Sequence, residues 1–198
     1  MEARFADRLR LPMQFDPSRL REDLDALGTA EWLEHFVRQN YDGDWSVIPL
    51  RAQAGAVHPV MMMFSNPAAT EFTDTPLLAR APYFRRVLHD LACPLHCVRL
   101  MRLTPGSVIK EHHDNDLAAE FGRARLHIPI TTGPDVDFRL NGTRVIMEPG
   151  SVWYLRLSDP HSVANRGPGD RVHLVIDAVV NDWLTTQLEH ASHPLLPT

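Results

Sequence analysis

The amino-acid sequence predicts a mainly β protein, a sandwich or barrel of short strands braced by a few helices. Between about residue 93 and residue 180, short apolar or alternating runs are separated by turn-forming segments. Asn141-Gly142 stands between two alternating runs, which is a strong local signal for a tight hairpin. Pro149-Gly150 marks another turn. This density of short strands implies a β-sandwich or barrel.

Helices are expected near the N-terminus. The first begins at Asp16-Pro17, because Asp can accept hydrogen bonds from the free amides of a first turn and Pro suits that turn. Gly28 ends it. A second helix is expected over residues 29 to 40, where Trp32 and later apolar residues recur at helical spacing. We expect both helices to support a sheet.

Strands are expected from Trp45 onward, with one further helix. WSVIPLRA and AVHPVMMMF are short, apolar or alternating, and broken by Pro and Gly. The helix is expected near residues 82 to 92, over PYFRRVLHDLA. The later strand candidates are HCVRLMRL, SVIKEH, ARLHIPIT, DVDFRLNGTRVIME, GSVWYLRL and DRVHLVIDAVV.

Length and composition indicate an ordinary globular protein. The 198 residues suffice for one well-buried core, so we expect a single domain over 1–198, with helical support in 1–44 and the β core in 45–180. No apolar run approaches the roughly 20 residues of a bilayer span, and the start has no signal-peptide stretch. We therefore expect a cytoplasmic location and no membrane partner.

Charge and cysteine content exclude further classes. The net charge is −5 without a basic stripe, so nucleic acid is not an expected partner. Cys93 and Cys97 are expected to be reduced, buried thiols rather than a disulfide or half of a zinc site. Met61-Met62-Met63 is expected to pack in a strand and Trp153 in the core. Oligomeric state stays open.

Two histidines and a carboxylate form a candidate metal site. Two His and one carboxylate can occupy one face of an octahedral iron(II) ion and leave three positions open. In an extended strand His112 and Asp114 project from the same side, because side chains repeat with period two. His161, after the Asp159-Pro160 turn, is well placed as a third ligand from a distant strand. Alone, H-x-D is a weak signal that is more typical of a solvated loop.

Two later strand candidates each carry an Arg and a His two residues apart. Arg171 and His173 share one face of their strand, and Arg125 and His127 share one face of theirs. A sandwich with a wet outer face would give the same alternation. A guanidinium, however, binds a carboxylate with two charge-assisted hydrogen bonds, which suits a dicarboxylate cosubstrate beside a metal.

The motifs PGSVIKEHHD, RLHIPI, GSVWYL, DPHSVANRG and DRVHLVIDA resemble the aspartyl/asparaginyl β-hydroxylase family, which includes hydroxylases of free proline. The order and spacing cover roughly residues 40 to 180, and YDGDWSVIPLRA fits the family's earlier portion. The resemblance implies a double-stranded β-helix, the cupin-like jelly roll, as the core over 45–180. It also implies iron(II) and 2-oxoglutarate as cofactors.

Carried over residue by residue, the resemblance places His112, Asp114 and His161 on the iron ligands. Arg171, ten positions after His161, falls on the arginine that binds the distal carboxylate of 2-oxoglutarate. Arg125 and His127 resemble the strand pair that contacts the cosubstrate in some members, at a longer interval from His112.

Asp114 makes the chain similar to the proline-hydroxylase branch, because members that act on folded modules can lack this ligand. The chain is short for the extra C-terminal helical segment of that branch, so the substrate is not carried over.

The expected function is a 2-oxoglutarate-dependent dioxygenase that uses Fe(II) and O2 to hydroxylate an unactivated C–H bond. The expected substrate is amino-acid-like, either a free amino acid or a peptidyl Asp or Asn at the β carbon, and the coproducts are succinate and CO2. The main alternative is a non-oxidative cupin-like protein that binds a metal or small ligand. A zinc enzyme could use the same ligands but leaves Arg171 and Arg125 without a role. A nucleic-acid demethylase conflicts with the acidic balance.

Overall fold

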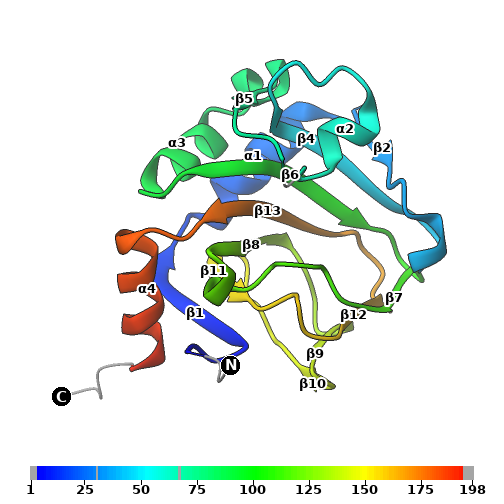
Figure 1. The fold of residues 1–198 in the computed structure, drawn as a ribbon. Helices are drawn as coiled ribbons and strands as arrows, with labels where there is room; N and C mark the ends of the chain where they lie inside the picture. The colour runs from blue at the N-terminus through cyan, green and yellow to red at the C-terminus, as the bar shows by residue number, and fades with distance from the viewer. Residues whose placement is uncertain (1–3, 30, 67, 194–198) are drawn as a thin grey trace.

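The computed structural model describes residues 4–29, 31–66 and 68–193 and confirms the mainly β fold (Figure 1). Two antiparallel sheets face each other. The larger runs in the order β1 (Arg8–Gln14), β11 (Ser151–Leu155), β8 (Arg123–Thr131), β13 (Arg171–Val179), β6 (Leu95–Leu103), β4 (Trp45–Gln53) and β2 (Leu33–Glu34), with β5 (Phe72–Asp74) paired to β4. The smaller runs β10 (Thr143–Arg144), β9 (Val136–Leu140), β12 (His161–Asn165), β7 (Val108–His112) and β3 (Tyr41–Asp42).

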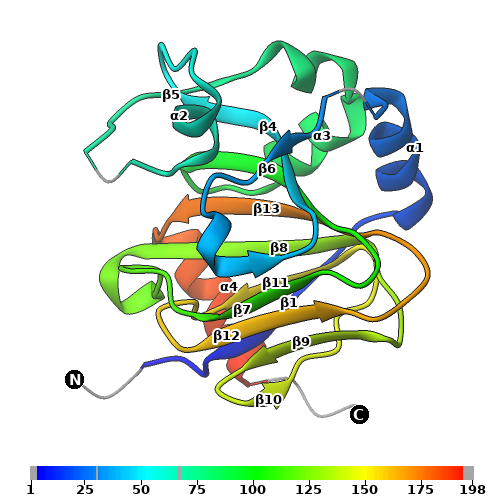
Figure 2. The same ribbon diagram turned by 90° about the vertical axis from the view of Figure 1, so that its right-hand side faces the viewer.

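Three α-helices, over residues 17–27, 82–90 and 182–192, cover the outer face of the large sheet. Figure 2 views the small sheet from the front, with α4 behind the large sheet. None of the helices in the described part of the chain is long and apolar enough to span a bilayer. The α-helices are α1 (Pro17–Leu27), α2 (Pro59–Met63), α3 (Pro82–Asp90) and α4 (Asp182–Ser192), and the short 3-10 segments are η1 (Arg38–Asn40), η2 (Pro76–Arg80) and η3 (Ala119–Phe121).

Two apolar cores follow from the alternation of the strands. Between the large sheet and the helices, Leu174 and Ile176 of β13 pack in one cluster with Phe84 of α3 and Leu184 of α4. Between the two sheets, the second cluster includes Val175 of β13. Successive residues of β13 thus serve opposite faces, and the odd-numbered ones face the small sheet.

The first helix and the hairpin form as predicted. The Asp16 carboxylate accepts from the backbone N–H of Ser18 at 2.9 Å, and Gly28 ends α1 with φ of 77°. Asn141 and Gly142 have φ of 50° and 71°, the positive pair that a tight turn between β9 and β10 requires.

The helix expected over residues 29 to 40 was wrong. The segment forms β2 and the short η1, and β2 pairs with β4. The His35 ring stacks on Trp45 with 3.6 Å between ring centroids, and the His35 N–H donates to the Trp45 carbonyl at 2.8 Å. These contacts with β4 outweigh the weak helical pattern, because a short helix gains little stability of its own.

The strand expected over AVHPVMMMF was also wrong, because this segment contains the short helix α2. His58 accepts from the Val60 N–H at 3.3 Å, and Pro59 occupies the first helical position. Met63 is buried, but Met61 is 37% exposed, so the three methionines do not pack as a strand. The Pro that interrupts a strand pattern here begins a helix.

Two elements at the ends of the chain were not predicted. β1 adds an edge to the large sheet by pairing with β11. α4 begins where the Asn181 side chain accepts from the Leu184 N–H at 3.0 Å, and Leu188 of this helix is fully buried. The tail from 190 to 198 was expected to be loosely held. Residues 190–192 belong to α4, and 194–198 lie outside the described residues.

Candidate active site

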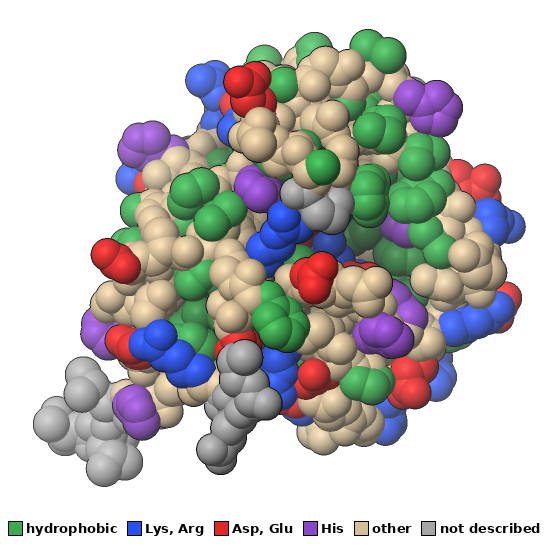
Figure 3. Space-filling view, in the orientation of Figure 1, with side chains coloured by type: hydrophobic (Ala, Val, Ile, Leu, Met, Phe, Trp, Pro, Cys, Tyr) green, Lys and Arg blue, Asp and Glu red, His purple; other side chains and the backbone are tan. Residues whose placement is uncertain are grey.

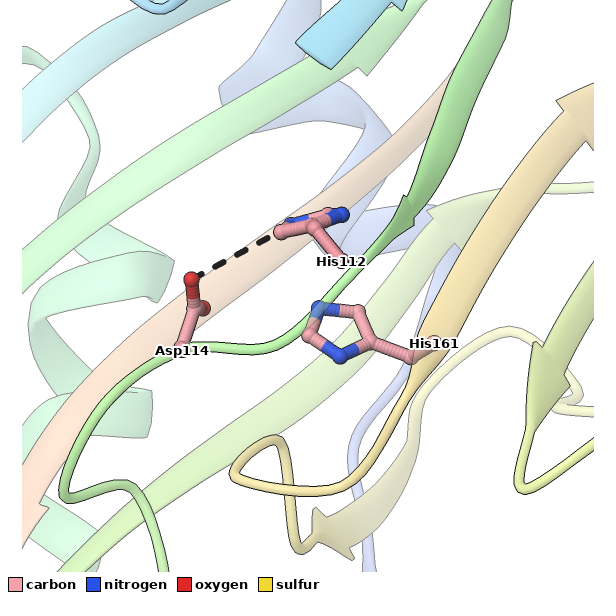
Figure 4. A group of neighbouring side chains, drawn as sticks. All are labelled: His112, Asp114 and His161. Atoms are coloured by element: carbon pink, nitrogen blue, oxygen red, sulfur yellow. Dashed lines mark ion pairs between the residues drawn. The ribbon is translucent and has the colours of Figure 1, made fainter.

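His112, Asp114 and His161 come together at one end of the small sheet (Figure 4). His112 ends β7 and His161 begins β12, and the two are direct register partners with ring centroids 4.3 Å apart. Asp114 follows β7, where its backbone N–H donates to the Leu157 carbonyl at 2.7 Å. One ligand atom from each side chain lies within 4.8 Å of the others. The three residues predicted from H-x-D and a distant His are therefore adjacent.

Backbone carbonyls fix how both imidazoles present their nitrogens. Nδ1 of His112 lies 2.8 Å from the Lys110 carbonyl, and Nδ1 of His161 lies 3.0 Å from the Asp159 carbonyl. A carbonyl can only accept, so each Nδ1 carries the proton and each Nε2 keeps a lone pair. Metal-binding histidines are typically oriented in this way. The residues present thus fit an octahedral divalent metal such as iron(II).

Burial keeps His161 neutral. Removal from water, together with the neighbouring His112, lowers the pKa of His161 to about 4, although the hydrogen bond to the Asp159 carbonyl opposes the shift. Its exposed fraction is 5%. At neutral pH the ring is therefore an uncharged donor, the form that binds a metal ion.

Arg125 holds one oxygen of Asp114 and leaves the other free. Its NH1 donates to Oδ2 of Asp114 at 2.5 Å, and Oδ1 lies 4.0 Å from Nε2 of His112. Burial raises the pKa of the Asp114 carboxyl, but Arg125, His161 and His112 outweigh it and bring the pKa below its usual range. Asp114 is thus an ionised, oriented candidate ligand.

The same arginine belongs to a buried ion network across three strands. Nε and NH2 of Arg125 donate to Asp177 of β13 at 2.6 and 3.1 Å. Arg99 of β6 donates at 2.9 Å to Oδ2 of Asp177, the oxygen that also accepts from NH2 of Arg125, and at 2.9 Å to the Met63 carbonyl. Burial raises the pKa of Asp177, but the two arginines lower it far more, so this carboxylate stays charged. Arg125, predicted as a cosubstrate contact, therefore has three nitrogens already bonded to carboxylates.

Arg171, His173 and His127 form a second buried group beside the candidate metal site. NH2 of Arg171 lies 2.9 Å from Nδ1 of His173, which lies 3.3 Å from Nδ1 of His127. Their exposed fractions are 3%, 1% and 5%, so the alternative of a wet sheet face is wrong. Within the described ranges, no carboxylate pairs with Arg171, and its Nε is buried without a partner. A buried cation without a counter-ion points to an anionic ligand.

Both groups open into one cavity of about 530 Å³ between the sheets. Figure 3 shows the molecular surface hollowed near its centre, with basic side chains at the back and hydrophobic ones at the rim. The apolar residues of its lining include Phe36, Trp45, Met63, Phe64 and Met101. The polar and charged residues of its lining include His35, Arg99, His112, Asp114, Arg123, Arg125, His127, His161, Arg171 and Asp177.

Sequence reasoning did not assign a role to Asp177, Arg99 or His173. The alternation of β13 carries the signal for two of them, since Arg171, His173 and Asp177 share the face toward the small sheet. Their pairing with β8 brings Asp177 opposite Arg125. That register depends on bulges, which the pattern does not reveal.

Comparison with known proteins decides the family. The family model described as aspartyl/asparaginyl β-hydroxylase matches residues 14–180. The chain belongs to the aspartyl/asparaginyl β-hydroxylase family. The resemblance drawn from the motifs is thereby confirmed. The match begins at the last residue of β1 and ends one residue after β13.

One relative and two solved structures are similar over most of the chain. L-proline cis-4-hydroxylase of Rhizobium meliloti (strain 1021) is 26% identical over 185 residues, which are 92% of this chain and 64% of that protein. A 2OG-Fe(II) oxygenase family oxidoreductase from Burkholderia pseudomallei superposes with a TM-score of 0.55 at 16% identity, covering 87% of this chain and 84% of that one. HygX from Streptomyces hygroscopicus, solved with nickel and 2-oxoglutarate bound, gives 0.55 at 14% identity, covering 90% and 84%. These likenesses confirm the jelly-roll fold.

Asn165 in this β-hydroxylase family member has a structural position. Its Nδ2 donates to the carbonyls of Leu103 and Gly169, both at 2.9 Å, and its Oδ1 accepts from the Gly167 N–H at 3.1 Å. The side chain thus ties the turn before β13 to the end of β6. It holds Arg171, two residues after Gly169, at the start of its strand.

Proposed function

We propose that this chain is an Fe(II)- and 2-oxoglutarate-dependent dioxygenase that hydroxylates a C–H bond of an amino-acid-like substrate. The proposal places iron on Nε2 of His112, Nε2 of His161 and Oδ1 of Asp114, the atoms left free by the surrounding hydrogen bonds. Three ligands from the protein leave three positions for cosubstrate and O2.

The observation that carries the proposal is the buried, uncompensated Arg171. Burial lowers the pKa of Arg171 to about 9, so the guanidinium is still charged at neutral pH. The guanidinium carbon of Arg171 lies 5.9 Å from the ring centroid of Phe138. The Phe138 ring in turn stacks with the His161 ring, with 6.5 Å between their centroids. The cation is therefore one aromatic ring away from a candidate metal ligand. A dicarboxylate whose keto-acid end meets the metal could place its distal carboxylate on Arg171.

The protein's own residues bind the metal and the cosubstrate, orient them and shield them from solvent. When bound, iron with 2-oxoglutarate and O2 supplies the oxidising power to insert one oxygen atom into a C–H bond, with succinate and CO2 as coproducts. His127 lines the cavity beside Arg171, which supports a position of its ring against the cosubstrate. We assign Arg125 to the support of Asp114, because its nitrogens are already bonded.

The substrate is proposed to be a small amino acid or an amino-acid side chain. The cavity of about 530 Å³ lies in the range typical of small-molecule sites, and its lining includes several apolar side chains. The relative named as an L-proline cis-4-hydroxylase supports free proline as the first candidate, with peptidyl Asp or Asn as alternatives. The chain spans 64% of that relative's length, so its substrate enters here only as a proposal.

The test is anaerobic reconstitution with Fe(II) and 2-oxoglutarate, followed by exposure to O2 with a panel of amino acids and peptides. The expected result is iron-dependent formation of succinate and, with the right substrate, a product heavier by one oxygen atom. A non-oxidative cupin-like protein would bind the metal but consume no 2-oxoglutarate with or without any substrate. That outcome would contradict the proposed function.

A further inference from the structure

We propose that His173 is a positioning residue that holds the Arg171 guanidinium ready for the distal carboxylate of 2-oxoglutarate. The inference rests on the proposed function, because it assigns Arg171 to that cosubstrate. His173 does not line the cavity, so it acts through Arg171 rather than by contact with a ligand. Arg171 and His173 lie two residues apart on the same face of β13, with NH2 of Arg171 2.9 Å from Nδ1 of His173.

The chemistry of the pair fixes the tautomer of His173. An arginine nitrogen can only donate, so Nδ1 of His173 must be the unprotonated acceptor and Nε2 must carry the proton. Nδ1 of His127 lies 3.3 Å from the same acceptor and therefore carries a hydrogen itself. Burial, together with the Arg171 charge, brings the pKa of both imidazoles well below the usual range. The Arg171 cation thus lies beside two neutral imidazoles, those of His173 and His127.

His173 holds one nitrogen of the guanidinium and leaves others available. Among the described residues, Nε of Arg171 is buried without a partner, and NH1 has no hydrogen bond. Each of these nitrogens can donate to a carboxylate oxygen. The long arginine side chain loses rotamer freedom when it binds a ligand, and a contact that already restrains it reduces that loss.

The same strand shows why a neutral acceptor matters at position 173. Four residues further on, Asp177 faces Arg125 and Arg99, and its carboxylate neutralises them. A carboxylate at position 173 would bind Arg171 in the same manner and compete with the cosubstrate. An imidazole restrains the arginine without cancelling its charge, which leaves the charge for the ligand.

Two variants separate this role from simple packing. His173→Asn keeps an acceptor close to the position of Nδ1, and His173→Leu removes it. The measurement is calorimetric titration of 2-oxoglutarate into the Ni(II)-loaded protein, with Ni(II) affinity and melting temperature as controls. We expect His173→Leu to weaken 2-oxoglutarate binding by about 10-fold or more, since hydrogen bonds to charged groups have effects of this size. We expect His173→Asn to stay within about 3-fold of the wild type.

A double variant tests that the effect passes through Arg171. In an Arg171→Met background, adding His173→Leu should change 2-oxoglutarate binding no further, because the restrained group is gone. In turnover, His173→Leu should raise KM for 2-oxoglutarate and leave kcat at saturation unchanged.

Equal binding by wild type and His173→Leu would overturn the inference and leave the proposed function standing. An equal loss in the Arg171→Met background would also overturn it. Failure of the metal-loaded wild type to bind 2-oxoglutarate would overturn both.

Discussion

The guanidinium of Arg125 donates to Oδ2 of Asp114 across 2.5 Å and leaves Oδ1 of that carboxylate toward the two histidines. The other nitrogens of Arg125 are held by Asp177, which Arg99 holds in turn. The candidate carboxylate ligand is therefore oriented by a series of ion pairs that runs from Arg99 on β6 through Asp177 on β13 to Arg125 on β8. Such outer contacts commonly change metal affinity by about 10- to 100-fold when they are removed.

Arg125→Lys should weaken metal binding by about 10- to 100-fold, because Lys keeps the charge but cannot bind both carboxylates with one planar group. Titration with Ni(II) under anaerobic conditions measures the affinity. Arg139→Lys is the matched control, since Arg139 is half exposed on β9 and pairs with Asp137. Equal affinities for wild type and Arg125→Lys would show that Asp114 needs no support from this residue.

Asp177→Asn should lower the free energy of unfolding at pH 7 by about 3–5 kcal/mol, because two buried arginines lose their shared counter-ion. The lowered pKa of Asp177 means that its contribution is complete above the carboxyl's usual pKa and is lost as the pH falls through the lowered value. Urea unfolding measures the change. Asp74→Asn, which removes an exposed partner of Arg51, should cost less than about 1 kcal/mol. Similar losses for both variants would refute the buried network as a source of stability.

The metal-free protein should lose stability as the pH falls below about 6.5. Burial lowers the pKa of His35 to about 3 and of His161 to about 4, and the pKa values of His127 and His173 lie well below the usual range. As the pH falls, these histidines are therefore protonated in the unfolded chain before they are protonated in the folded protein. Between its unfolded-state pKa and its folded-state pKa, each of them lowers the free energy of unfolding by about 1.4 kcal/mol per pH unit. His35→Phe keeps an aromatic ring stacked on Trp45 but removes one titrating group. It should therefore reduce the pH dependence of the free energy of unfolding by about 1.4 kcal/mol per pH unit. A free energy of unfolding that is flat from pH 7 to pH 5 would contradict these shifts.

Arg171→Lys should raise the concentration of 2-oxoglutarate needed for half-maximal turnover, because the charge remains but the planar, two-donor geometry is lost. Metal affinity should be unchanged, since no hydrogen bond joins Arg171 to the three candidate ligands. Initial rates of succinate formation at varied 2-oxoglutarate measure the effect. An unchanged dependence on 2-oxoglutarate would place the distal carboxylate elsewhere.

The strand core was predictable because its signals are local. Alternation marks β13, and the Asn141-Gly142 pair sets the hairpin between β9 and β10. The segment around Trp32 was not predictable, because stacking of His35 on Trp45 and pairing with β4 are contacts made only after folding. Met61 to Met63 has the composition of a strand, but Pro59 starts a helix there.

The candidate site divides in the same way. His112 and Asp114 are two residues apart and His161 follows a turn, so spacing and the family motif sufficed to predict that these three side chains lie together. The partners of Arg125 depend on which residue of β13 lies opposite, and that register is set by bulges in β13. Period-two alternation shows that Asp177 shares a face with Arg171, but not that it binds Arg99 and Arg125.

The most direct test of the central claim is Fe(II)-dependent conversion of 2-oxoglutarate to succinate by wild type, His161→Ala and His89→Ala, each reconstituted anaerobically and then exposed to O2. His89 is 87% exposed in its side chain on α3 and provides the matched control. We predict succinate formation by wild type and His89→Ala, and none by His161→Ala, with the fold of all three retained by circular dichroism. Succinate formed equally by His161→Ala would contradict the assignment of His112, Asp114 and His161 as the metal site.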